Sequence, residues 1–174
     1  NELQLVLHDC GNSNWYILKS AQLEQSYALN AKFETQVYMY AAVEIILNIV
    51  ISHEEISSIY KLLSTFLNYV KTIEKNPVLI YWRFVLRLFE KLGIPIHTGK
   101  CSICSGDETA FAAFSLQNNG FICSNCFSPQ LQNTMSIYPA VSRIIQKIST
   151  IGKYRDSLQV EKITIDQINK IITI

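Results

Sequence analysis

Two cysteine pairs constrain this chain of 174 residues more than any other feature. Cys101 and Cys104 form one C-x-x-C pair, and Cys123 and Cys126 form the second, with residues 105–122 between them. This spacing is typical of a metal site in which the intervening segment returns as a short β-hairpin. Four thiolates fill a tetrahedral shell and leave no position for water, so we expect a structural Zn²⁺.

The segment that carries the cysteines, residues 100–127, is poorly equipped to fold without a metal. Few of its apolar residues are available to bury: Phe111, Phe114, Leu116, Phe121 and Ile122. Structural zinc contributes an apparent free energy of about 10–16 kcal/mol in small modules. Glycine commonly follows the second cysteine of such a pair, but Ser105 and Phe127 take these positions here, so we expect looser turns. Unpaired thiolates also indicate a reducing compartment, most simply the cytoplasm.

Three other candidate ligands are expected to stay outside the metal site. Cys10 stands beside a predicted turn and is expected to be a small buried hydrophobe. His97 is expected to be a surface histidine, since four sulfurs already saturate the metal. His53 begins an H-x-E match to zinc deaminases. Lys100 stands where that motif has proline, however, and the second cysteine pair would have no function, so we expect no enzymatic activity.

Apolar periodicity outside the cysteine segment predicts a mainly α-helical chain with one short β-hairpin. Leu3, Leu5 and Leu7 alternate along a first strand, residues 9–14 form the turn, and residues 15–18 form the second strand. A lone hairpin is marginal in water, so it should pack on the helices or belong to a β domain.

Three amphipathic helices are predicted between residues 33 and 92. The apolar stripe of the first is Phe33, Val37, Tyr40, Val43, Leu47 and Val50. Ser52 is expected to cap the second helix. The stripe of this helix is Ile56, Ile59, Leu63, Phe66, Val70 and Ile73. Asn76 is expected to cap the third helix before a first-turn proline, and Gly93 to end it.

The C-terminal region also contains helical signals. Pro139 can open a helix, and Asp166 can cap a last one. Residues 160–165 alternate and fit a strand equally well.

The charge balance gives no overall attraction to nucleic acid, because 15 basic residues face 14 acidic ones. Two local basic clusters are therefore the candidate sites for DNA or partner proteins. The first steps by four along the third helix: Arg83, Arg87 and Lys91. The second follows the cysteine segment: Arg143, Lys147, Lys153 and Arg155. A merely solvated face is the alternative for both clusters. A membrane span is excluded, since Glu44 and Asn48 interrupt the most apolar stretch, residues 37–51.

The order of these features resembles the bacterial recombination mediator family RecO. The most specific part is the segment from Trp82 to Pro95, in which a helix ends in Leu-Gly and is followed at once by the cysteine pairs. These pairs flank Phe114, Ser115 and Gly120. The resemblance covers nearly all of the chain.

The resemblance implies a fold with an N-terminal OB barrel, a helical domain and a zinc module. Residues 1–20 would be the last strands of the barrel, residues 21–99 and 128–174 the helical domain, and residues 100–127 the zinc finger. The fold class expected is thus a mainly α helical bundle with an inserted four-cysteine module and a hairpin remnant of the barrel. The principal DNA-binding surface of the barrel would lie outside the chain.

The resemblance also implies a function without covalent chemistry. The expected function is annealing of complementary strands in DNA repair and, with RecR, loading of RecA onto single-stranded DNA. The implied partners are single- and double-stranded DNA, RecR and the acidic C-terminal tail of single-stranded-DNA-binding protein. A slot for that tail is expected on the third helix, with Trp82, Val85 and Phe89 as its apolar wall. A zinc-ribbon module for protein interactions or transcription remains the alternative.

Overall fold

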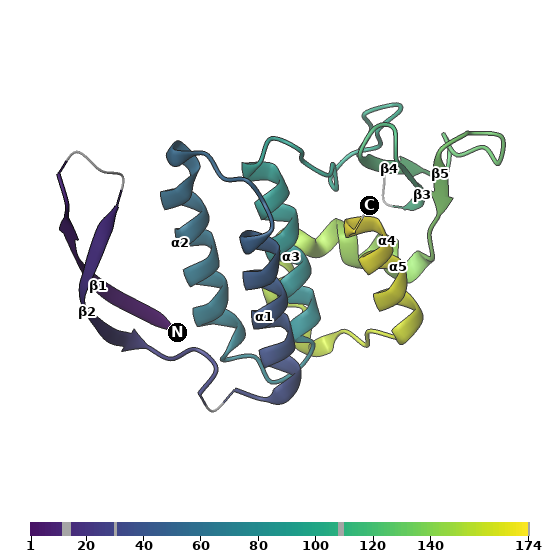
Figure 1. Ribbon diagram of the computed structural model, residues 1–174. Helices are drawn as coiled ribbons and strands as arrows, with labels where there is room; N and C mark the ends of the chain where they lie inside the picture. The colour runs from purple at the N-terminus through teal and green to yellow at the C-terminus, as the bar shows by residue number, and fades with distance from the viewer. Residues whose placement is uncertain (12–14, 30, 108–109, 174) are drawn as a thin grey trace.

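A computed structural model describes residues 1–11, 15–29, 31–107 and 110–173 of the chain (Figure 1). Helices dominate it, with a two-stranded hairpin at one side and a small three-stranded sheet at the other. The elements that precede the cysteine segment are β1 (Glu2–Asp9), β2 (Tyr16–Gln25), α1 (Phe33–Leu47), α2 (His53–Val70) and α3 (Pro77–Lys91). The later ones are β3 (Phe111–Ser115), β4 (Gly120–Cys123), β5 (Thr134–Ser136), α4 (Pro139–Lys147), the 3₁₀ helices η1 (Ile148–Lys153) and η2 (Arg155–Ser157), and α5 (Lys162–Ile172).

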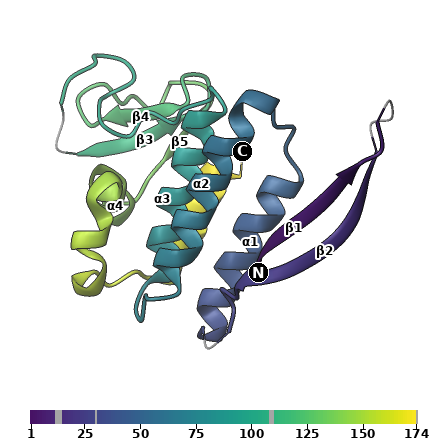
Figure 2. The same cartoon turned by 90° about the vertical axis from the view of Figure 1, so that its left-hand side faces the viewer.

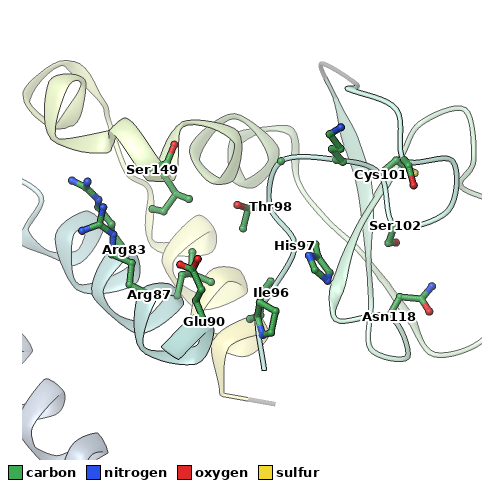
Figure 3. A pocket seen from close by; sticks show the side chains of 16 residues that line it. Arg83, Arg87, Glu90, Ile96, His97, Thr98, Cys101, Ser102, Asn118 and Ser149 are labelled. Atoms are coloured by element: carbon green, nitrogen blue, oxygen red, sulfur yellow. The ribbon is translucent and has the colours of Figure 1, made fainter. Parts of the chain in front are cut away.

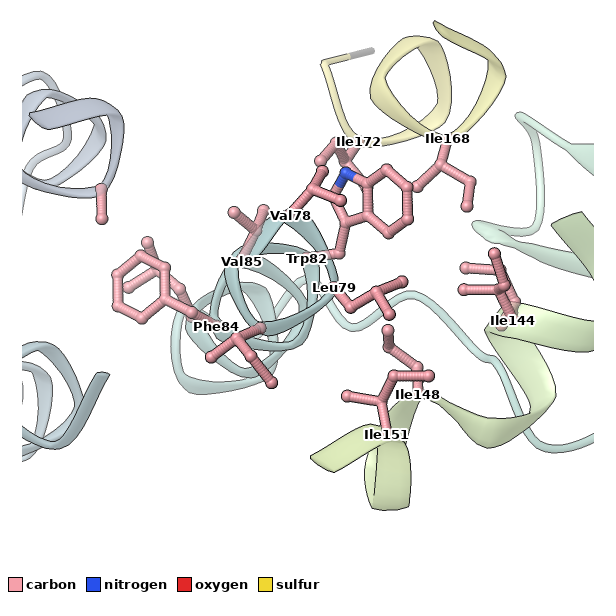
Figure 4. Close-up of a cluster of buried hydrophobic side chains, with 14 of the residues drawn as sticks. Val78, Leu79, Trp82, Phe84, Val85, Ile144, Ile148, Ile151, Ile168 and Ile172 are labelled. Carbon is pink, nitrogen blue, oxygen red and sulfur yellow. The ribbon is translucent and has the colours of Figure 1, made fainter. Parts of the chain in front are cut away.

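Helix α3 is the centre of the hydrophobic core. Trp82, Leu79 and Leu88 are completely buried in it. The Trp82 indole packs against Ile168 and Ile172 of α5, and its Nε1–H donates a hydrogen bond to Asn169 Oδ1 at 2.8 Å (Figure 4). Burial of a large aromatic side chain with its polar atom paired gives the core both apolar area and a fixed orientation. The helix thus joins α1 and α2 on one side to the C-terminal helices on the other.

The apolar stripe predicted for α1 is not the face that this helix buries in the core. Tyr40 is 63% exposed and Val50, beyond the end of the helix, is 96% exposed. The buried residues of α1 are instead Thr35, Met39 and Ala42. Helix α1 is apolar around most of its circumference, and small side chains such as that of Ala42 let it approach α3 closely. The more regular stripe therefore faces outward.

Of the N-caps predicted for α2 and α3, Ser52 is confirmed and Asn76 is wrong. Ser52 begins α2, and the Glu55 carboxylate accepts hydrogen bonds from both the backbone N–H and the hydroxyl of Ser52. Asn76 precedes α3 in the left-handed conformation (φ 53°), but its side chain does not cap that helix. Its amide donates instead to the carbonyls of Arg155 and Leu158 at 2.6 and 2.9 Å, which ties the start of α3 to the η2 region.

The N-terminal hairpin is confirmed, and β2 continues beyond Ser20 to Gln25. Its two strands pair antiparallel, with Leu3 opposite Leu23 and Leu5 opposite Ala21. The hairpin lies on the side of the helices away from the three-stranded sheet in both views (Figures 1 and 2). Cys10 is exposed here, so the expectation that it is a buried hydrophobe was wrong.

Few contacts hold the hairpin to the helical body. The Glu2 carboxylate accepts hydrogen bonds from the hydroxyls of Tyr27 and Tyr60, which lower the pKa of this carboxyl. Gln25 Nε2 donates to Asn68 Oδ1 at 2.9 Å. The leucine-rich face of the hairpin stays about half exposed.

The C-terminal region is helical. Residues 162–165 belong to α5, so the strand considered for residues 160–165 is wrong. Pro139 opens α4 as predicted, whereas Asp166 lies inside α5, which Glu161 precedes. Among the residues described, no helix is both long enough and apolar enough to cross a membrane.

Candidate metal centre

The four cysteines of the two pairs converge at one point. The four sulfur atoms all lie within 4.8 Å of one another; they belong to Cys101, Cys104, Cys123 and Cys126. The Sγ atoms of Cys104 and Cys123 are 4.0 Å apart. A tetrahedron with Zn–S bonds of about 2.3 Å has edges of about 3.8 Å. The sulfurs therefore fit a four-coordinate metal such as Zn²⁺, and all four are free thiols.

Both cysteine turns are closed by backbone hydrogen bonds. Ser105 N–H donates to the Cys101 carbonyl at 2.9 Å, and Phe127 N–H donates to the Cys123 carbonyl at 3.0 Å. Ser105 reaches this geometry with a φ of 59°, the left-handed region that usually selects glycine. The looser turns expected from the missing glycines are thus not found, because Ser105 adopts the strained conformation itself.

The electrostatics of the cluster favour a bound cation. Burial by itself opposes ionisation of Cys101, but N–H groups aimed at its sulfur, including those of Cys123 and Ile103 at 3.4 Å, lower the pKa of the thiol to about 6. Hydrogen bonds with Cys123 and Cys104 raise the pKa of Cys126 to about 12. Close thiols cannot all ionise unless a positive charge compensates them. A divalent metal supplies that charge and lets every sulfur act as a thiolate ligand.

The small sheet attaches the metal centre to the helical core. Its strand order is β4-β3-β5, and both pairs are antiparallel. Phe111 and Phe114 of β3 pack against Phe121 of β4, with ring centroids 5.3 and 5.1 Å apart. Phe111 N–H also donates to Ser142 Oγ of α4 at 2.8 Å. The module therefore shares one hydrophobic core with the helices, while its metal face has a small apolar cluster of its own.

The residues of the first basic cluster differ in burial along α3. Arg83 is half-buried, and burial together with the nearby charge of Arg87 lowers its pKa. Its Nε is a buried atom without a hydrogen-bond partner among the described residues. Arg87 is exposed beside it, and Lys91 is exposed at the end of the helix. Within the described residues, neither Arg83 nor Arg87 forms an ion pair with a carboxylate.

The second basic cluster is spread over α4, η1 and η2. Arg155 is engaged within the fold: its guanidinium donates to Tyr69 Oη at 2.6 Å and lies over the ring of that tyrosine. Lys147 lies over the ring of Tyr154, 4.9 Å from the ring centroid. Arg143 and Lys153 are exposed.

Two hollows meet at Arg83 and Arg87. The smaller, about 90 Å³, lies between α2 and α3, and its other lining residues are Leu62, Thr65, Phe66, Tyr69, Ile80 and Phe84. The larger, about 980 Å³, separates α3 and η1 from the metal module. In Figure 3, Arg83 and Arg87 extend side by side at one end of this cleft, and Ser102 and Asn118 lie on the module at the other. The sequence predicted a slot on the third helix but not the larger cleft, because the residues that line the cleft come from separate segments.

A helical body with an attached module whose four cysteines could hold a metal ion defines the class of this protein. Its family follows from the comparison with family models: residues 31–173 match the C-terminal domain of recombination protein O, and the chain belongs to this family. The match runs from the residues just before α1 to the end of α5 and includes the whole metal module. A comparison with proteins of curated function finds no match.

Proposed function

We propose that the chain is the helical and zinc-binding part of a non-enzymatic recombination mediator that acts in the cytoplasm. In this proposal the β1–β2 hairpin is the remnant of an OB barrel, and four thiolates hold a structural Zn²⁺. The mediator binds single- and double-stranded DNA, anneals complementary strands and, with RecR, helps to load RecA onto single strands. Family membership supports a role in recombination and repair.

One observation carries the assignment of a binding surface to this chain. Arg83 and Arg87 lie side by side at the junction of a pocket and a cleft, and among the described residues neither forms an ion pair. Two adjacent guanidinium groups without a carboxylate repel each other, so an anionic ligand that neutralises them gains affinity. Phosphates of DNA and the acidic tail of single-stranded-DNA-binding protein both have the required charge.

The apolar wall expected for the acidic tail is better assigned to other residues. Trp82 and Val85 have exposed fractions of only 0% and 1%, so they cannot contact a peptide. The pocket between α2 and α3 offers a more accessible wall, because the half-buried Leu62 and the partly exposed Tyr69 line it next to both arginines, while Phe66 and Phe84 are almost completely buried at its base. A peptide that ends in Phe could place its ring against these side chains and its carboxylates on Arg83 and Arg87.

The double substitution Arg83→Glu and Arg87→Glu is expected to weaken binding of the acidic tail peptide by about 2 kcal/mol or more, because it replaces charge-assisted bonds with repulsion. Isothermal titration calorimetry measures this change, and circular dichroism verifies that the helices persist. Lys170→Glu is the control, because Lys170 is an exposed cation of α5 that belongs to neither basic cluster and lines neither hollow. Equal affinities of the wild type and a folded double variant would place the peptide elsewhere.

Binding of DNA by this chain is expected to be weak and to fall steeply with salt, because it depends on phosphate contacts of the exposed cations. Fluorescence anisotropy with a labelled oligonucleotide at two salt concentrations measures it. A module that only binds proteins would give no salt-dependent signal. Tight binding that is insensitive to salt would contradict the electrostatic mechanism.

A further inference from the structure

The cleft between α3 and the metal module differs in chemistry from the apolar pocket on the other side of the arginines. The pocket is small and has aromatic and aliphatic walls, whereas the cleft is about ten times larger by volume. Much of the module side of the cleft carries hydrogen-bonding groups: His97, Thr98, Lys100, Ser102, Ser105 and Asn118. Such donors, together with cations, suit phosphate and sugar groups rather than the terminal aromatic ring of a peptide.

Unpaired polar groups are found at both ends of this cleft. The Nε atom of Arg83 and the Oγ atom of Ser102 are the two buried side-chain atoms that lack a hydrogen-bond partner within the described part of the chain. Buried polar groups are normally paired, so a small rotation of either side chain toward the cleft would give its polar atom a partner. Figure 3 places these two residues on opposite sides of the cleft, so a single small anion would not reach both.

Lys100 adds a positive charge on the module side. Its only ion pair in the described structure is with Asp107 at 3.8 Å, and both side chains are well exposed. Exposed ion pairs of this kind contribute little and are screened by salt, so Lys100 can rotate toward a ligand. Among the residues that the structure describes, Glu90 is the one carboxylate that lines the cleft. The cleft therefore has cations at its two ends and a single acidic residue on its α3 wall.

We propose that this cleft holds a segment of single-stranded nucleic acid, with backbone phosphates on Arg83 and Arg87 at one end and on Lys100 at the other. The inference rests on the proposed function and deepens it by naming the path of the strand. Because the arginines also line the apolar pocket, a strand in the cleft and an acidic peptide in the pocket exclude each other. The acidic tail would then be released as the strand enters.

The residues that line only one of the two hollows make the proposal testable. Lys100 and Glu90 line the cleft alone, and Leu62 and Phe66 line the pocket alone. Lys100→Glu is expected to weaken binding of fluorescein-labelled oligo(dT) by about threefold or more and to lower the slope of log K against log[salt] by about 0.7 per lost phosphate contact. Glu90→Gln is expected to tighten oligo(dT) binding by about twofold. Neither substitution should change the affinity for the acidic tail peptide.

Glu90→Gln is the more informative variant, because a loss of structure would not increase the affinity for oligo(dT). Lys100 is adjacent to a cysteine ligand, so the metal content of the Lys100→Glu variant is measured in parallel. Oligo(dT) affinities unchanged in both variants would overturn the cleft while leaving DNA binding by this chain intact. Absence of any oligo(dT) binding by the wild type at low salt would instead refute the proposed function itself.

Competition tests the shared arginines directly. Addition of the acidic tail peptide to the metal-loaded protein with bound oligo(dT) is expected to lower the anisotropy, and the apparent affinity for oligo(dT) should fall in proportion to peptide occupancy. A peptide that binds by calorimetry but leaves the oligo(dT) affinity unchanged would show that the two ligands do not share Arg83 and Arg87.

Discussion

Replacing Cys123 by Ser is expected to release the metal and to unfold the cysteine turns while α1, α2 and α3 stay folded. Cys123 is completely buried in a small cluster together with Cys101, Ala113 and Ile122. That cluster is too small to hold the turns without the metal, whose binding contributes about 10 kcal/mol or more in comparable modules. Amide hydrogen exchange should show lost protection at Ser105 and Phe127 and persistent protection in α3.

Cys10→Ser is the control for this substitution, because Cys10 is an exposed thiol in the hairpin. It should leave both metal content and amide exchange unchanged. A Cys123→Ser variant that keeps its metal and its protected turns would contradict the assignment of Cys123 as a ligand.

Truncation of Trp82 is expected to have the largest effect on the stability of the helical body. Trp82→Ala removes a completely buried indole between α3 and α5 and leaves Asn169 Oδ1 without its donor. Large aromatic truncations in cores cost about 3–5 kcal/mol. Urea denaturation followed by circular dichroism measures the loss of unfolding free energy.

Tyr40→Ala is the matched aromatic truncation on the exposed face of α1. Surface substitutions of this kind change stability by about 0.5 kcal/mol or less. If the two variants were equally destabilised, the assignment of the outward face of α1 would be wrong.

The convergence of the four cysteines could be predicted from sequence because its information is local. A C-x-x-C pair already fixes two ligands on one turn, so only the meeting of two turns had to be inferred. The same is true of the α2 cap, where Ser52 and Glu55 interact within one turn of helix. Ser105 differs: the sequence correctly shows that glycine is missing but cannot show that serine takes the left-handed conformation.

The features that sequence did not predict depend on contacts between distant segments. Helix α1 has apolar residues on most sides, and its orientation is decided by how closely Ala42 and Met39 approach the core. Asn76 resembles a helix cap, yet carbonyls near residues 155–158 take its side-chain donors. The cleft needs α3, η1 and the metal module at once, so no single segment predicts it.

The module, the cleft and the proposed path of the strand all depend on one claim, that the four thiolates hold a single metal ion. X-ray absorption at the zinc edge of the purified protein, combined with elemental analysis, tests it most directly. One zinc per chain with four sulfur ligands at about 2.3 Å is the expected result. A protein without stoichiometric metal, or a metal bound through nitrogen or oxygen in place of any of the four sulfurs, would contradict it.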